Sequence, residues 1–236
     1  MHSPRVRPNR GSDPWGIVAQ APHIFDLMRR RPPIFFLVRH GAICQSLSDR
    51  WWGRIEVPLA ADAEMALSRT ASILEAVQPT RLIASPAQRA VASATILQRQ
   101  LRLSVEVMPA LAEVDLGEFA GHTMAESAQL FPVAWRSYLA DTVDSVPPGG
   151  ESFRRFAQRV FAWAGAQPQD QDIVVVTHTG VILALACASI GLELADRVRL
   201  GQPPPASLSV LRLVPPVLHR FAQGNEITGH HGAARG

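Results

Sequence analysis

The chain contains no lysine, and all 23 of its basic residues are arginine. Its net charge of +3 and its isoelectric point near 9.6 would suit a protein that binds nucleic acid. Such proteins gather their positive charges on one face, whereas these arginines are scattered along the chain. We therefore expect no nucleic-acid partner. The arginine content, together with abundant Ala, Pro and Gly, indicates the codon bias of a GC-rich genome.

Cysteine is also scarce, with only Cys44 and Cys187 in 236 residues. Their separation excludes a Cys-x-x-Cys motif and argues against a disulfide framework or a structural zinc site. This usage is typical of a reducing compartment and predicts a cytoplasmic protein. Cys44 lies close to His40 in sequence and could be taken for a nucleophile. A small buried residue is the interpretation that we favour for it.

Long apolar runs are nearly absent, and only residues 173–190 approach the length of a membrane span. His178 and Gly180 interrupt that run where a strand would pass into a helix. A buried strand, turn and helix therefore explains it better, and we expect no membrane partner. The overall composition, 47% hydrophobic and 18% charged, is that of a globular protein.

Two regions differ in pattern. Residues 1–33 are rich in Pro and Arg, lack sustained periodicity and contain no apolar segment of secretory type. They predict a loosely ordered extension, with at most a short helix near residues 24–30. Residues 34–236 predict a single folded domain.

Within that domain strands alternate with helices. The predicted strands are residues 34–38, 81–84, 104–107 and 173–177, followed by an edge pair at 207–213 and 217–221. The predicted helices are residues 62–77, 86–99, 123–140 with a break at Pro132, 152–166 and 180–190. The second helix should begin with Ser85 as its N-cap and Gln88 completing a capping box. This alternation predicts an α/β fold, a three-layer αβα sandwich around a mostly parallel central sheet.

Charged side chains follow several of these strands. Carboxyl ends of parallel strands meet at one edge of a sheet, where ligands bind, so these side chains should share one pocket. The set comprises Arg39, His40, Arg89, Glu113 and His178. Arginine recognises phosphate oxygens, a neutral histidine can attack phosphorus, and a carboxylic acid can protonate a leaving oxygen. The set therefore suits phosphoryl transfer, in which fixed cations stabilise the spread negative charge.

Six segments, in order, also resemble the motifs of the histidine phosphatase superfamily, which includes the cofactor-dependent phosphoglycerate mutases. They are Leu-Val-Arg-His-Gly at 37–41, a Gly-to-Leu turn at 53–59 with Glu56 in place of Asp, Ser-Pro-x-x-Arg-Ala at 85–90, Leu-x-Glu-x-x-x-Gly-x-x-x-Gly at 111–121, Pro-Gly-Gly-Glu-Ser at 148–152, and Val-Thr-His-Thr-Gly-Val at 176–181. The resemblance covers residues 34 to 230 and implies a phosphoglycerate mutase-like fold.

By this resemblance His40 would be the nucleophile that becomes phosphohistidine, and Glu113 would be the general acid. Arg39, Arg89 and His178 would bind the phosphoryl group. Asp115 and Glu118 remain alternative sources of the acid. Ser46 and Thr179 align with substrate-binding positions of the family, and Ala42 stands where the family usually has Glu or Gln. The resemblance implies neither a metal nor a cofactor. It implies a phosphorylated small molecule as the partner.

The motif contexts favour the phosphatase branch, hence a metal-independent phosphomonoester hydrolase, over phosphoglycerate mutase-type transfer. A non-catalytic phosphate-binding domain is a further alternative. Residues 122–150, the cap segment, are expected to cover the pocket and select the leaving group. Phe131, Trp135 and Tyr138 in this segment could favour an aromatic partner or could simply pack together. The sequence makes no prediction of oligomeric state.

Overall fold

The computed structural model describes residues 33–44, 49–168 and 170–213. The predicted helix near residues 24–30, the strand at 217–221 and Ser46 lie outside the described residues. The division into an extension and a domain at residue 33 stays a prediction.

The described domain is built around one five-stranded sheet with the order β3-β2-β4-β1-β5. The strands are β1 (Ile34–Arg39), β2 (Arg81–Ala84), β3 (Val105–Val107), β4 (Ile173–Thr177) and β5 (Leu208–Arg212). All pairings are parallel except that of β5, which runs antiparallel to β1. The apolar runs of β1 and β4 are explained by burial on both faces of the sheet.

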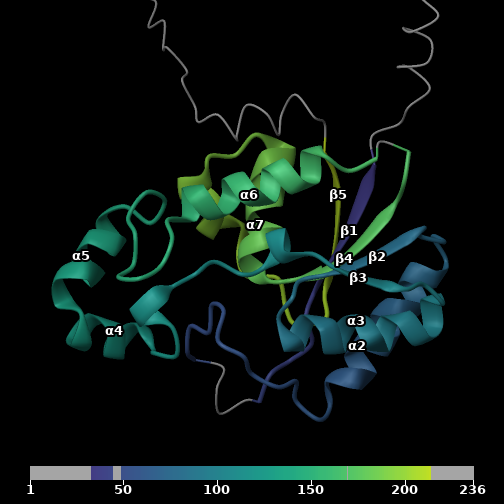
Figure 1. The fold of residues 1–236 in the computed structure, drawn as a ribbon, viewed down its shortest axis with the longest axis horizontal. Helices are drawn as coiled ribbons and strands as arrows, with labels where there is room; N and C mark the ends of the chain where they lie inside the picture. The colour runs from purple at the N-terminus through teal and green to yellow at the C-terminus, as the bar shows by residue number, and fades with distance from the viewer. Residues whose placement is uncertain (1–32, 45–48, 169, 214–236) are drawn as a thin grey trace, which may run out of the picture. The chain divides into compact units, whose positions relative to one another are not determined.

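Four helices cover the two faces (Figure 1). On one face α2 (Ala63–Glu75) and α3 (Gln88–Leu101) pack against strand residues such as Phe36 and Val38. On the other, α6 (Phe153–Gly165) and α7 (Thr179–Ile190) pack against residues such as Phe35 and Leu37. Successive strand residues point to opposite faces, so a single apolar run supplies both cores. The predicted three-layer αβα architecture is confirmed, and the described element boundaries lie within two residues of the predicted ones.

A smaller apolar cluster lies beside this sandwich and includes residues of the cap segment. These residues come mainly from α4 (Met124–Leu130) and α5 (Pro132–Ala140), which are separated at Phe131 as the proline predicted. Thr123 and Glu126 form a capping box at the start of α4. Phe119 and Trp135 are the buried centre of the cluster. Three short 3-10 helices complete the described elements: η2 (Pro109–Leu111), η3 (Gly117–Phe119) and η4 (Leu194–Leu200).

The predicted capping box at the start of α3 is wrong. The N-cap residue is Ala87, whose side chain makes no capping hydrogen bond. The Ser85 hydroxyl lies 3.4 Å from the Ala87 amide but only 2.6 Å from Nε2 of His178. Instead, the amide of Gln88 donates to Oε2 of Glu56 at 2.8 Å. The Glu56 carboxylate, from a loop distant in sequence, therefore accepts from a backbone amide at the start of α3. The Ser85 hydroxyl instead lies within hydrogen-bond distance of the His178 ring.

The interpretation of Cys44 as a small buried residue is also wrong, because its side chain is exposed. Cys187 is buried in α7, where burial raises the pKa of its thiol to about 11. In the described part of the chain, no helix has the length and apolarity needed to cross a bilayer.

Candidate active site

The register of the sheet places both histidines at the same edge. Arg39 pairs with Thr177 across β1 and β4, so the next residue of each strand, His40 and His178, lies just beyond the edge. The amide of His40 donates to the carbonyl of Thr177 at 2.9 Å, and the amide of Ser85 donates to Val176 at 2.9 Å. Because β4 lies between β1 and β2, these three strand ends converge on His178.

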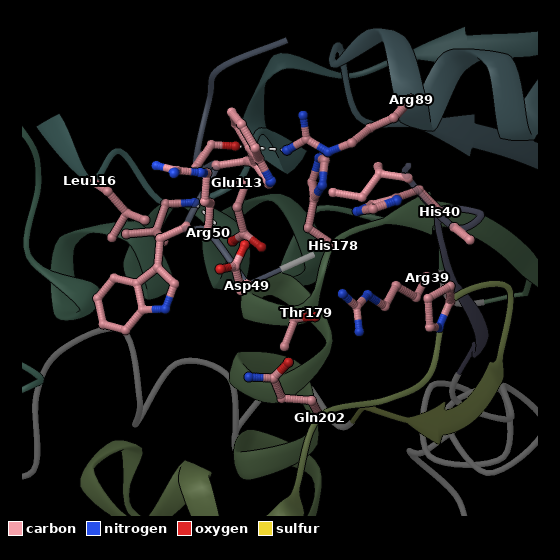
Figure 2. Close-up of a pocket in the computed structure, with 17 residues that line it drawn as sticks. Arg39, His40, Asp49, Arg50, Arg89, Glu113, Leu116, His178, Thr179 and Gln202 are labelled. Atoms are coloured by element: carbon pink, nitrogen blue, oxygen red, sulfur yellow. Dashed lines mark hydrogen bonds between the residues drawn. The ribbon is translucent and has the colours of Figure 1, made fainter. Parts of the chain in front are cut away.

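A cavity of about 580 Å³ opens at this edge. Its lining includes all five residues of the predicted catalytic set: Arg39, His40, Arg89, Glu113 and His178. Figure 2 shows their side chains directed into the same space, although they come from four different parts of the chain. Thr179 and Ala42 also line the cavity. The roles predicted for these residues stay predictions, but their convergence is observed.

The ring of His40 is held in one tautomer. Its Nδ1 lies 2.8 Å from the carbonyl of Gly41, and since a carbonyl only accepts, Nδ1 carries the proton. Burial lowers the pKa of His40 to about 3, helped by the charges of Arg89 and Arg39 and opposed by the hydrogen bond to Gly41. At neutral pH the ring is therefore uncharged, with the lone pair on Nε2. This is the form in which a histidine can act as a nucleophile.

His178 lies beside His40, with 5.2 Å between the ring centroids. Its Nε2 is 2.6 Å from the Ser85 hydroxyl, while its Nδ1 is buried and has no partner among the described residues. Burial, together with the charge of Arg89, holds the pKa of His178 well below its usual value. If the serine hydroxyl donates to Nε2, Nδ1 carries a proton that is available to a bound oxygen.

Two arginines bring positive charge to the cavity. Arg89 donates from Nη1 to the carbonyl of Ile55 at 2.9 Å and from Nη2 to that of Gly53 at 2.7 Å. Arg39 donates from Nη1 to Pro203 at 2.6 Å, and its Nε is buried without a partner among the described residues. Burial lowers the pKa of both side chains, yet a guanidinium stays charged in a protein. Partly buried cations with unused donors favour an anionic ligand.

Two acids line the cavity, Asp49 and Glu113; Asp49 is exposed, whereas Glu113 is more deeply buried. The amides of Val114 and Gly180 donate to its two carboxyl oxygens at 2.9 and 3.0 Å. Burial raises the pKa of Glu113 in spite of these bonds, which favours the protonated form. Asp115 and Glu118, the two alternatives, are not part of the cavity lining, and Glu118 is exposed.

The aromatic residues of the cap segment pack together. Trp135 stacks on Tyr138 with ring centroids 5.9 Å apart, and Phe119 contacts both rings and Phe131. None of the described residues from 122 to 150 lines the cavity. The cluster borders the cavity through Trp51, Val114 and Leu116, and of these Trp51 contacts the ring of Trp135.

Sequence reasoning missed several residues around the cavity. Ser93 accepts from the amide of Gly41 at 2.9 Å and donates to the carbonyl of Arg89 at 2.6 Å, so it joins the segments that carry His40 and Arg89. Ser85 stands in a recognised motif, but a local capping rule gave it a different role. Trp52 and Gln202 line the cavity without any signal in the sequence that would single them out. In the part of the chain that the structure describes, no group of three or more His, Cys, Asp or Glu side chains could hold a metal ion.

These features define a class of protein: an α/β domain whose pocket brings together two neutral histidines, two arginines and a buried glutamate with a raised pKa. The sequence profile of the histidine phosphatase superfamily (branch 1) matches residues 35–216, and the chain belongs to this superfamily.

The relatives of this chain are consistent with that assignment. It is 29% identical over 179 residues to glucosyl-3-phosphoglycerate phosphatase of Mycobacterium tuberculosis, covering 70% of this chain and 78% of the relative. It is 26% identical over 160 residues to adenosylcobalamin/alpha-ribazole phosphatase of Escherichia coli, covering 66% and 79%. The structure of mycobacterial glucosyl-3-phosphoglycerate phosphatase in complex with VO3 superposes with a TM-score of 0.66 at 28% identity, over 75% of this chain and 92% of that one. In general terms the chain is a phosphatase.

Proposed function

We propose that this protein hydrolyses phosphate monoesters of small metabolites, without a metal ion, through a phosphohistidine intermediate. The tautomer of His40 is the observation that carries the proposal. Its hydrogen bond to Gly41 leaves the Nε2 lone pair free in a cavity that also contains Arg39 and Arg89. An uncharged nucleophile facing two cations matches what attack on a phosphate dianion requires.

In the first step Nε2 of His40 forms a bond to phosphorus, and the bond from phosphorus to the ester oxygen breaks. Glu113 donates its proton to that oxygen, so the alcohol leaves neutral and the glutamate becomes a carboxylate. Arg39, Arg89 and Nδ1 of His178 stabilise the negative charge on the other phosphoryl oxygens.

In the second step water attacks phosphorus, and the bond from nitrogen to phosphorus breaks. The Glu113 carboxylate takes a proton from the attacking water, which restores the acid for the next turnover. Inorganic phosphate leaves, and His40 returns to its neutral form.

The charges around the cavity favour a phosphatase over a mutase. A phosphoglycerate carries a carboxylate beside its phosphate and needs a second cation. Among the described lining residues, the only arginine besides Arg39 and Arg89 is Arg50. Its guanidinium donates to both carboxyl oxygens of Glu126, at 2.7 and 3.1 Å, and to the carbonyl of Gly121 at 2.8 Å. Because Arg50 is already neutralised, leaving groups without a charge should be preferred.

Trp51 connects the cap segment to the part of the cavity where the leaving group would bind. Trp51 lines the cavity and rests on the aromatic cluster of α5, so a change in α5 would move a wall of the cavity. The cap segment would then select the leaving group through Trp51 rather than by direct contact.

Phosphate release, measured with EDTA present, tests the proposal. The substrates are p-nitrophenyl phosphate and a panel that includes glucosyl-3-phosphoglycerate, alpha-ribazole phosphate and simple sugar phosphates. We expect turnover that His40→Ala abolishes. His122→Ala, which changes a histidine outside the cavity lining, serves as the matched control. A phosphate-binding domain without catalysis would show binding but no turnover in the wild-type protein, and metal-dependent release would contradict the mechanism.

A further inference from the structure

The Pro-Gly-Gly-Glu-Ser segment at 148–152 lies directly against the loop that carries Glu113. The amide of Glu151 donates to the carbonyl of Asp115 at 2.9 Å, and the amide of Glu118 donates to that of Pro148 at 2.9 Å. A Cβ on Gly150 would stand 2.5 Å from the Asp115 carbonyl oxygen, so only glycine allows this approach. The close contact brings the Glu151 side chain against the acid loop.

Oε1 of Glu151 accepts three hydrogen bonds. They come from the Asp115 amide at 3.0 Å, from Nη2 of Arg54 at 2.8 Å and from Nη2 of Arg159 at 2.9 Å. The Glu151 side chain is only 12% exposed. Burial raises the pKa of this carboxyl, but the bonds from Arg159 and Asp115 outweigh it and lower the pKa, so Glu151 stays ionised. The carboxylate therefore joins two arginines and the loop backbone at one point.

The same two arginines also donate hydrogen bonds to the backbone of Glu113. Its carbonyl accepts from Nε of Arg54 at 3.2 Å and from Nη2 of Arg159 at 3.1 Å. Arg159 further donates from Nη1 to the carbonyl of Ala110 at 2.7 Å, and its guanidinium lies 4.8 Å from the centre of the Phe156 ring. Helix α6 thus holds both ends of the segment 110–113 through one side chain.

Neither Glu151 nor Arg159 lines the cavity, so neither touches a bound ester directly. We propose that they are positioning residues: the Glu151–Arg159 pair fixes the main chain of Glu113 so that its carboxyl stands at the leaving-group oxygen. This inference rests on the function proposed above, in which Glu113 is the general acid. A displacement of about 1 Å in a reacting group can reduce a rate about a hundredfold, which is why such a support matters.

Comparison of two esters tests this proposal, because they differ in their need for a proton. p-Nitrophenolate leaves as a stable anion and needs little help from an acid, whereas the alkoxide of glycerol 2-phosphate must be protonated. For Glu151→Gln we expect kcat/KM to fall about ten- to a hundredfold for glycerol 2-phosphate. For p-nitrophenyl phosphate it should change less than about threefold, because binding and attack by His40 are untouched.

Two further variants make the test specific. Arg159→Lys keeps the positive charge but loses the paired donors of the guanidinium, and it should show the same contrast between the two esters. It replaces Glu151→Gln as the test if that variant does not fold. Arg154 lies on the same helix as Arg159 and forms an exposed ion pair with Asp144, which precedes the helix. Arg154→Gln breaks this pair and should change the rate with neither ester.

Each outcome of the experiment decides the proposal. A selective loss with the glycerol ester supports it. An equal loss with both esters would show that the pair only holds the fold together, and wild-type values with both would show that it does nothing for Glu113. Failure of the proposed function itself would look different, because the wild-type protein would then show no turnover that depends on His40.

Discussion

Replacing Gly180 with alanine should displace the Glu113 carboxyl, the proposed general acid, while leaving the other proposed catalytic groups in place. Gly180 lies in the first turn of α7, where its amide donates to Oε2 of Glu113 at 3.0 Å. An added Cβ would overlap Oε1 of Glu113 and would stand 3.2 Å from Cζ of Phe156. Phe156 is fully buried in the core, so the glutamate must move.

The expected size of the effect follows from the role of the acid. General acid catalysis contributes roughly 10²- to 10⁴-fold, which corresponds to about 3–5 kcal/mol of activation free energy. We expect a loss of this order in kcat/KM for glycerol 2-phosphate. The strain of the extra methyl group should cost about 1–3 kcal/mol of folding free energy. A gain of up to about 1 kcal/mol in helix propensity offsets part of it, so Tm should fall by only a few degrees.

A double-mutant cycle shows whether the effect passes through Glu113. In a Glu113→Ala background the clash has no carboxyl to displace, so adding Gly180→Ala should reduce kcat/KM little further. Losses that multiply in the double variant would refute this reasoning, as would a single Gly180→Ala variant with wild-type activity on the glycerol ester.

The remaining predictions concern pH, the second histidine and phosphate binding. Because burial lowers the pKa of His40 and raises that of Glu113, the reactive pair of a neutral ring and a protonated acid should persist at weakly acidic pH. A pH–rate profile of kcat/KM should therefore decline as the pH rises through the pKa of Glu113, and a steady increase toward alkaline pH would contradict this assignment. Ser85→Ala removes the partner of His178 Nε2, and we expect kcat/KM to fall about tenfold, as for the loss of one buried hydrogen bond. An unchanged value for p-nitrophenyl phosphate would show that the serine does not orient the ring. Inorganic phosphate at a hundred times its Kd should stabilise the fold by about 2.7 kcal/mol, seen as a rise in Tm by thermal unfolding. Arg89→Ala should lose most of that rise, and a variant that keeps it would exclude Arg89 from the phosphate site.

Local sequence rules predicted the helices and strands well because these elements form from the pattern of apolar residues within each segment. The apolar runs that form β1 and β4, and the stripe of residues such as Phe156 and Val160 on α6, follow from burial alone. The same rules failed at the start of α3. Ser85 has the chemistry of an N-cap, but His178 and Glu56, far away in sequence, decide which hydrogen bonds form there.

By itself the sequence determined which residues reach the edge of the sheet, since each catalytic candidate follows a recognisable strand or opens a recognisable helix. Only the tertiary structure decided the protonation states and the charge pairing of those residues. The neutral ring of His40, the raised pKa of Glu113 and the occupied guanidinium of Arg50 depend on burial and on partners from other segments. Protonation and charge pairing are set by the surroundings of a group in space, and residues distant in sequence supply those surroundings.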